Sequence, residues 1–206
     1  SLEPPRVERR LPKAILSVFE AEQILKQPDV TMPRGLRDRA ILELLYATGV
    51  RRQELAALRI DDVDLEDGRL MVRQGKGKKD RVLPLSERAC AWIGKYLEEA
   101  RFRLYRGPDR GALFLTSLGD RMQPGQVTKI VRRSMEAAEI GKPGACHLFR
   151  HTLATLMLEG GADLRYVQAM LGHADISTTQ IYTRVAIGKL KEVLEKSHPG
   201  AKLGRR

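Results

Sequence analysis

The stretch from His147 to Tyr182 places several chemically reactive side chains on what reads as a helical framework. It holds three of the four histidines of the 206-residue chain, together with an arginine and a tyrosine. His147 and Arg150 are three positions apart, so on a helix they share a face. Phe149 and Leu153 recur at helical spacing on another face. The stretch therefore predicts a helix that buries one side and presents an imidazole and a guanidinium along the other.

Two further groups follow this helix. Gly172 and His173 come after a short helical segment and predict a turn that carries an imidazole. Tyr182 lies beyond this turn, near the start of another helical segment that Ser177 is expected to cap. Singly, each of these residue types is more often structural or solvent-exposed than catalytic. Their combination in one window is what indicates a site.

In order, spacing and flanking residues, this window resembles the active-site region of the tyrosine recombinases, the phage-integrase family, and most of all its bacterial Xer-like branch. That family carries a His-x-x-Arg box, then Leu-Gly-His, then a tyrosine. The matching positions are His147, Arg150, His173 and Tyr182. The resemblance spans residues 12–196, and it implies a helical catalytic domain. Full-length family members have a second, helical DNA-binding domain before the catalytic one, and nothing in this chain resembles it. We therefore expect residues 1–11 to be a linker or arm and residues 197–206 to be a disordered basic tail.

Composition points to an anionic partner. The formal net charge is +11 and 42% of the residues are hydrophobic, which suits one folded domain that binds a polyanion. Nucleic acid is the first candidate and an anionic membrane surface the second. The sequence shows no bilayer-spanning apolar run and no signal peptide. Cys90 and Cys146 fit neither a metal site nor a disulfide framework, so free thiols in the cytoplasm are expected.

A second arginine follows the turn Thr48-Gly49-Val50. The resemblance implies that Arg51, at the start of a short helix, is catalytic, and a guanidinium beside a helix N-terminus suits a phosphate. Arg52 is the local alternative. We hypothesise that Glu54 holds an active-site arginine in place.

Residues 69–74 and 81–85 read as strands that form a small antiparallel sheet with residues 63–65. The glycine-containing turn between them would let the chain approach a DNA backbone closely. The resemblance implies that a lysine of this turn enters the active site. Lys76 matches best, and Lys78 and Lys79 are alternatives that would otherwise contact phosphates. The alternative interpretation of this lysine-rich turn is a solvated loop without a catalytic role.

An acidic cluster precedes this sheet, and it has two interpretations. It comprises Asp61, Asp62, Asp64, Glu66 and Asp67. A metal-dependent nuclease could use such carboxylates. The favoured interpretation is structural, because Asp67-Gly68 is a hairpin turn signal and the first two acids suit a cap.

Helical patterns fill most of the remaining chain, and together with the small sheet they predict a mainly α fold of the α+β class. Expected helices cover residues 17–26, 37–47, 86–105 and 187–196, with one capped by Asp163 and one following Pro124. The helix after Pro124 is basic, and its side chains Lys129, Arg132 and Arg133 could lie along DNA. The alternative interpretation is an ordinary solvated helix face.

The resemblance implies the chemistry. Tyr182 would attack a DNA phosphodiester and form a 3′-phosphotyrosine bond, with His147 as base and Lys76 as acid. Arg51, Arg150 and His173 would stabilise charge on the phosphate oxygens. No metal and no other cofactor is implied. Duplex DNA is the expected partner, with self-association as a tetramer in a synaptic complex, or a monomer as an isolated domain. The alternatives are a type IB topoisomerase, a non-catalytic DNA-binding module and the metal-dependent nuclease.

Overall fold

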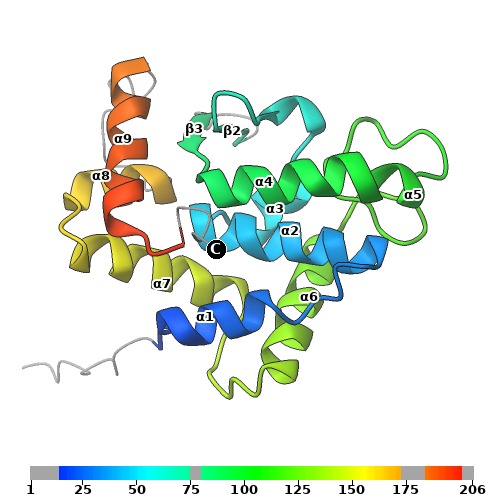
Figure 1. Cartoon of the computed structure of the whole chain (residues 1–206). Helices are drawn as coiled ribbons and strands as arrows, with labels where there is room; N and C mark the ends of the chain where they lie inside the picture. The colour runs from blue at the N-terminus through cyan, green and yellow to red at the C-terminus, as the bar shows by residue number, and fades with distance from the viewer. Residues whose placement is uncertain (1–13, 75–79, 173–183, 201–206) are drawn as a thin grey trace, which may run out of the picture.

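The computed structural model describes residues 14–74, 80–172 and 184–200. Figure 1 shows its helices, which are α1 (Val18–Leu25), α2 (Pro33–Thr48), α3 (Arg52–Ala57), α4 (Glu87–Tyr96), α5 (Phe102–Leu104), α6 (Pro124–Ala137), α7 (Cys146–Glu159), α8 (Leu164–Leu171) and α9 (Arg184–Ser197). The strands β1 (Val63–Asp64), β2 (Arg69–Val72) and β3 (Arg81–Pro84) form one antiparallel sheet in that order. The predicted mainly helical fold with a small antiparallel sheet is confirmed.

Helix α2 forms the centre of the fold, with α4 on one side and α7 on the other (Figure 1). Its side chains Ile41, Leu44 and Leu45, which recur at helical spacing, are fully buried. The helix begins at Pro33 rather than at the expected residue 37. Proline suits this first position because its fixed φ fits the helix and its missing N–H would have no partner there.

Gly49 ends α2 in the left-handed conformation, with φ of 61°. A Cβ at this position would lie 2.9 Å from the Leu153 side chain on α7 and 3.1 Å from the Leu171 side chain on α8. Glycine therefore does two things here: it adopts the positive φ without strain, and it lets α7 and α8 approach the start of α3.

The sheet is built around a tight turn at Gly68, as the Asp67-Gly68 signal predicted. Leu70 pairs with Leu83, and both side chains are buried. Next comes α4, which Ser86 caps by accepting a hydrogen bond from the Ala89 N–H at 3.2 Å. The expected single helix over residues 86–105 is interrupted by a π-helical turn, Leu97–Arg101, before α5.

The chain before α1 is fixed to α7 and to the loop that leads into it. The main-chain N–H of Leu16 donates a hydrogen bond of 2.9 Å to Thr152 Oγ1 on α7. Lys142 Nζ donates to the Ile15 carbonyl at 2.7 Å and to a carboxylate oxygen of Glu20 at 2.6 Å. These contacts hold the N-terminal end of α7 in place.

The C-terminal end corrects two expectations. Helix α9 begins at Arg184 rather than at residue 187, and the expected disorder from residue 197 on is wrong for residues 197–200. His198 is buried, and its ring stacks edge-on against Tyr46 at 4.4 Å between centroids. Its Nε2 lies 2.8 Å from the Tyr46 carbonyl oxygen, and its Nδ1 accepts a hydrogen bond from the Gly200 N–H at 3.0 Å. Within the described ranges, no helix has the length and apolarity needed to cross a bilayer.

Candidate active site

Arg51 lies at the N-cap of α3, as predicted. Its main-chain N–H donates a hydrogen bond of 2.8 Å to Glu54 Oε2, and its Nη1 donates to Oε1 at 3.1 Å. Its side chain is 38% exposed. The alternative, Arg52, turns away and donates to Thr128 Oγ1 on α6 at 3.1 Å. The hypothesis that Glu54 holds an active-site arginine in place agrees with these two hydrogen bonds from Arg51.

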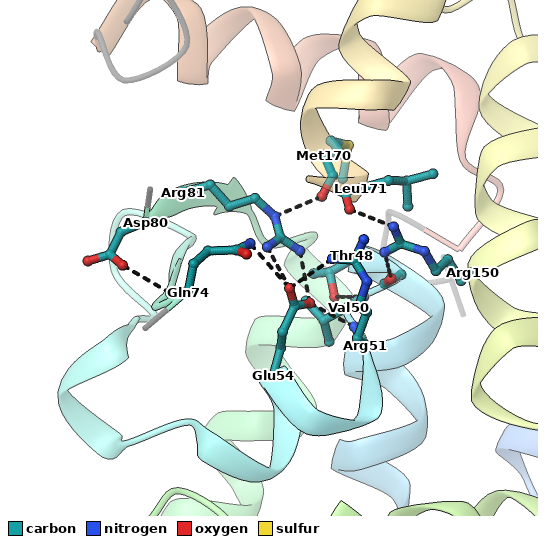
Figure 2. A network of polar contacts seen from close by, with 11 residues as sticks. Thr48, Val50, Arg51, Glu54, Gln74, Asp80, Arg81, Arg150, Met170 and Leu171 are labelled. Atoms are coloured by element: carbon teal, nitrogen blue, oxygen red, sulfur yellow. Dashed lines mark hydrogen bonds and ion pairs between the residues drawn. The ribbon is translucent and has the colours of Figure 1, made fainter. Parts of the chain in front are cut away.

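Arg150 on α7 reaches the same region from the other side, as Figure 2 shows. Its Nη1 donates a hydrogen bond of 2.9 Å to the Gly49 carbonyl, and its Nη2 donates to the Leu171 carbonyl at the end of α8. The residue is only 7% exposed, and none of the described carboxylates forms an ion pair with it. Burial, with a smaller contribution from the charge of Arg51, lowers the pKa of Arg150 to about 10. Among the described residues, it is thus a buried cation that forms no ion pair.

A third arginine, which the sequence analysis missed, completes this network. Arg81 on β3 is buried and donates two hydrogen bonds to the Glu54 carboxylate, at 2.8 Å and 3.0 Å. Its Nε donates to the Met170 carbonyl at 3.2 Å (Figure 2). The available signal was alternation, because Arg81 shares the inward phase of Leu83 and Leu85 along the strand. A charged residue at an inward position requires a buried partner.

Glu54 is the carboxylate that binds these groups together. It accepts five hydrogen bonds, two from Arg51, two from Arg81 and one from Gln74 Nε2 at 3.3 Å. Burial raises the pKa of Glu54, but the hydrogen bonds and charges of Arg81 and Arg51 outweigh it, so the pKa is below its usual value. Three guanidinium groups and one carboxylate leave this cluster with a net charge of +2. An anion is the ligand that such a surplus of positive charge favours.

His147 lies in the first turn of α7 and is exposed. The expectation that His147 and Arg150 would be presented together along one open face is wrong for Arg150, which is buried. The reason is tertiary: Gly49 and the end of α8 cover the guanidinium. Six residues named in the sequence analysis lie outside the described part of the chain: Lys76, Lys78, Lys79, His173, Ser177 and Tyr182. Gly172, immediately before His173, is the left-handed C-cap of α8, with φ of 72°.

The basic helix predicted to lie along DNA is α6. Lys129 and Arg132 are exposed on it. Arg133 is also exposed, but its Nη2 forms an ion pair of 2.6 Å with the buried Asp38. The first two side chains are thus better placed to neutralise an external phosphate than the third.

The acidic cluster before the sheet has structural roles. Asp62 is buried, accepts a hydrogen bond from the Arg59 main-chain N–H and pairs with Arg73. Asp64 accepts from the Asp67 N–H in the hairpin turn. The described part of the chain contains no group of three or more acidic, histidine or cysteine residues arranged to hold a metal ion.

Within the described residues, Arg150 is buried without an ion pair and lies near Arg51 at the start of a helix, an arrangement whose chemistry suits a phosphate. The profile of the Phage integrase family matches residues 15–188. The chain therefore belongs to the phage integrase family.

Curated relatives agree with this assignment. The chain is 52% identical over 198 residues to tyrosine recombinase XerC 2 of Ralstonia nicotianae, covering 96% of this chain and 57% of that protein. It is 43% identical over 197 residues to tyrosine recombinase XerD of the same organism, covering 96% of this chain and 62% of the relative. The chain thus spans about three-fifths of the length of these two relatives.

Solved structures show the same fold. The crystal structure of XerA recombinase matches with a TM-score of 0.72 and 35% identity, covering 95% of this chain and 67% of that one. XerH site-specific recombinase bound to palindromic difH substrate, in a post-cleavage complex, matches with a TM-score of 0.68 and 29% identity. That match covers 89% of this chain and 52% of the XerH chain.

Proposed function

We propose that this chain is the catalytic part of a tyrosine-type site-specific DNA recombinase, with residues 12–196 as the catalytic domain. The observation that carries the proposal is the meeting of Arg51 and Arg150 around a net positive charge, in a chain of the phage integrase family. Both guanidinium groups retain N–H donors that their described hydrogen bonds do not use. The scissile phosphate of duplex DNA supplies the missing negative charge.

The chemistry follows from that placement. Attack on a phosphodiester increases the negative charge on its two non-bridging oxygens, and fixed donors around them lower the barrier. Arg51 and Arg150 supply these donors from α3 and α7. Because Arg150 already donates to two main-chain carbonyls, its guanidinium is held in position before the substrate binds, so little reorganisation is needed.

The remaining steps rest on the family resemblance. The Tyr182 oxygen forms a bond to phosphorus while the bond from phosphorus to the 5′ oxygen breaks. His147 accepts the phenol proton, Lys76 gives a proton to the 5′ oxygen, and His173 donates to the phosphate. One phosphodiester bond replaces another, so no external energy source is required, and the reverse step rejoins the strand.

The proposal extends to partners and location. Duplex DNA is the substrate, and four protomers assemble on two DNA sites to exchange strands. That the similar XerH recombinase is described bound to its difH substrate supports duplex DNA as the partner. Residues 1–11 act as a linker or arm, and the working location is the cytoplasm.

A covalent-trapping experiment tests this function. The probe is a pool of nicked duplexes of randomised sequence, labelled at the 5′ end of the nicked strand, in a buffer containing EDTA. Cleavage just upstream of the nick releases a short oligonucleotide, so rejoining fails and the labelled strand stays attached to the protein. We expect a labelled band that resists SDS.

Tyr182→Phe is the matched variant, because it removes only the attacking oxygen. It should bind the duplex pool with the affinity of the original chain and give no SDS-resistant band. Persistence of the band in this variant would reassign the nucleophile. DNA binding by the original chain without any covalent band would refute the proposed chemistry.

A further inference from the structure

Arg81 is an unexpected member of the cluster, because it faces Glu54 rather than the open side of the site. Its side chain is 5% exposed, and its guanidinium donates to both oxygens of Glu54 and to the Met170 carbonyl. Figure 2 shows it between α3 and the end of α8. Arg81 therefore links Glu54 on α3 to the Met170 carbonyl on α8. The next carbonyl, that of Leu171, accepts a hydrogen bond from Arg150.

The hydrogen bonds of Glu54 show how Arg81 affects Arg51. Glu54 accepts from the Arg81 guanidinium at 2.8 Å and 3.0 Å, whereas its one bond with the Arg51 guanidinium is 3.1 Å. The two guanidinium groups compete for the hydrogen-bonding positions of one carboxylate, and their like charges repel each other. Without Arg81, Arg51 would be the remaining arginine on Glu54, and the carboxylate would draw the guanidinium inward and neutralise it.

We propose that Arg81 is a positioning residue, which occupies the Glu54 carboxylate so that the Arg51 guanidinium stays available to the phosphate, and which fixes the end of α8 relative to Arg51. This inference rests on the proposed function. Arg81 itself does not contact the substrate. Its loss would also lower the net charge of the four-group cluster from +2 to +1.

The first test compares cleavage with binding. Arg81→Met keeps an apolar side chain of similar length and removes the charge. We expect the rate of adduct formation on the nicked duplex pool to fall on the order of 100-fold, with DNA affinity nearly unchanged. Arg81→Lys keeps the positive charge but cannot make both hydrogen bonds to Glu54 in the same geometry, so its rate of adduct formation should be intermediate. Arg103→Met is the matched control, because Arg103 is exposed on α5, which carries none of the residues of the cluster, and it should cleave like the original chain.

A double variant separates positioning from a merely structural role. In Arg81→Met with Glu54→Gln, the competing negative charge is gone and the net charge of the cluster returns to +2. We expect this double variant to cleave roughly tenfold faster than Arg81→Met alone. If Arg81 only stabilises the fold, Glu54→Gln removes further hydrogen bonds and slows adduct formation below the rate of Arg81→Met. An unchanged rate in Arg81→Met, or a double variant slower than it, would overturn the proposal.

A crystal structure of Arg81→Met gives a readout that does not depend on activity. We expect the guanidinium of Arg51 to make two hydrogen bonds to Glu54 instead of one. A single, unchanged bond would contradict the proposal even if the variant is slow. If the original chain forms no adduct at all, the proposed function fails, and this structure then decides the role of Arg81 separately.

Discussion

At the scale of single residues, two buried titratable side chains differ in charge: Arg150 is buried in its charged form and His198 in its neutral form. Arg150 keeps its charge and donates to main-chain carbonyls, which leaves positive charge for a phosphate. His198 is held in its neutral form. Because the Gly200 N–H donates to Nδ1, the proton of the neutral ring lies on Nε2 and is donated to the Tyr46 carbonyl. Only the first arrangement calls for a charged ligand.

The His198 environment predicts a pH-dependent stability. Burial, with Arg88 adding to it, lowers the pKa of His198 to about 4 from 6.5. Between these values the unfolded chain binds one proton more than the folded chain, so the free energy of unfolding rises with pH. The contribution is complete above about pH 6.5 and is lost as the pH falls towards 4, by about 3 kcal/mol.

Urea unfolding at a series of pH values checks this prediction, with His198→Asn as the comparison. Asparagine can accept the Gly200 N–H but does not titrate. The original chain should lose stability relative to His198→Asn as the pH falls from 6.5 to 4. Parallel curves over this range would show that His198 is not buried as described.

At the scale of elements, the end of α8 is where the site is assembled. Arg81 and Arg150 hold its last two carbonyls, Met170 and Leu171, and Gly172 turns the chain out of the helix. A Cβ on Gly172 would lie 3.0 Å from the Arg81 guanidinium carbon. Glycine is thus required at this position both by its φ and by the arginine.

Alanine substitutions separate these two requirements. Gly161 also has a positive φ, of 87°, but nothing lies within 4 Å of a Cβ there. Gly172→Ala and Gly161→Ala should each lower the free energy of unfolding by about 1 kcal/mol. Only Gly172→Ala should also slow adduct formation, because it displaces Arg81. Equal cleavage rates in the two variants would argue against a functional contact between Gly172 and Arg81.

The elements also show what the sequence could and could not reveal. Asp163 caps a helix as predicted, and Ser17 and Ser86 cap the two helices that were expected to begin at these residues. Capping can be predicted because it depends on residues two or three positions apart. The contact of Arg81 with Met170 joins positions 89 apart, and that of Arg150 with Gly49 joins positions 101 apart. Such contacts arise from tertiary packing, which local sequence patterns do not reveal. The sequence analysis therefore named Arg51 and Arg150 as candidate site residues but missed Arg81 and the burial of Arg150.

At the scale of the whole molecule, the net charge of +11 predicts DNA binding that weakens steeply with salt. Lys129 and Arg132 are exposed on α6, so replacing both with alanine should reduce the slope of log affinity against log salt by about 0.9 for each phosphate that is no longer neutralised. Arg133→Ala should reduce it less, because Asp38 already balances that charge. Fluorescence anisotropy with a labelled duplex measures both slopes. A slope unchanged by the Lys129 and Arg132 replacements would remove α6 from the DNA-binding surface.

We propose that the fold places Arg51 and Arg150 so that both face one phosphate. The rate of covalent adduct formation by Arg150→Ala tests this most directly. Loss of one fixed donor at the phosphate should slow the reaction on the order of 100- to 1,000-fold. Arg103→Ala, which removes an exposed arginine of α5, should leave the rate unchanged. A folded Arg150→Ala variant that forms the adduct at the original rate would contradict the account.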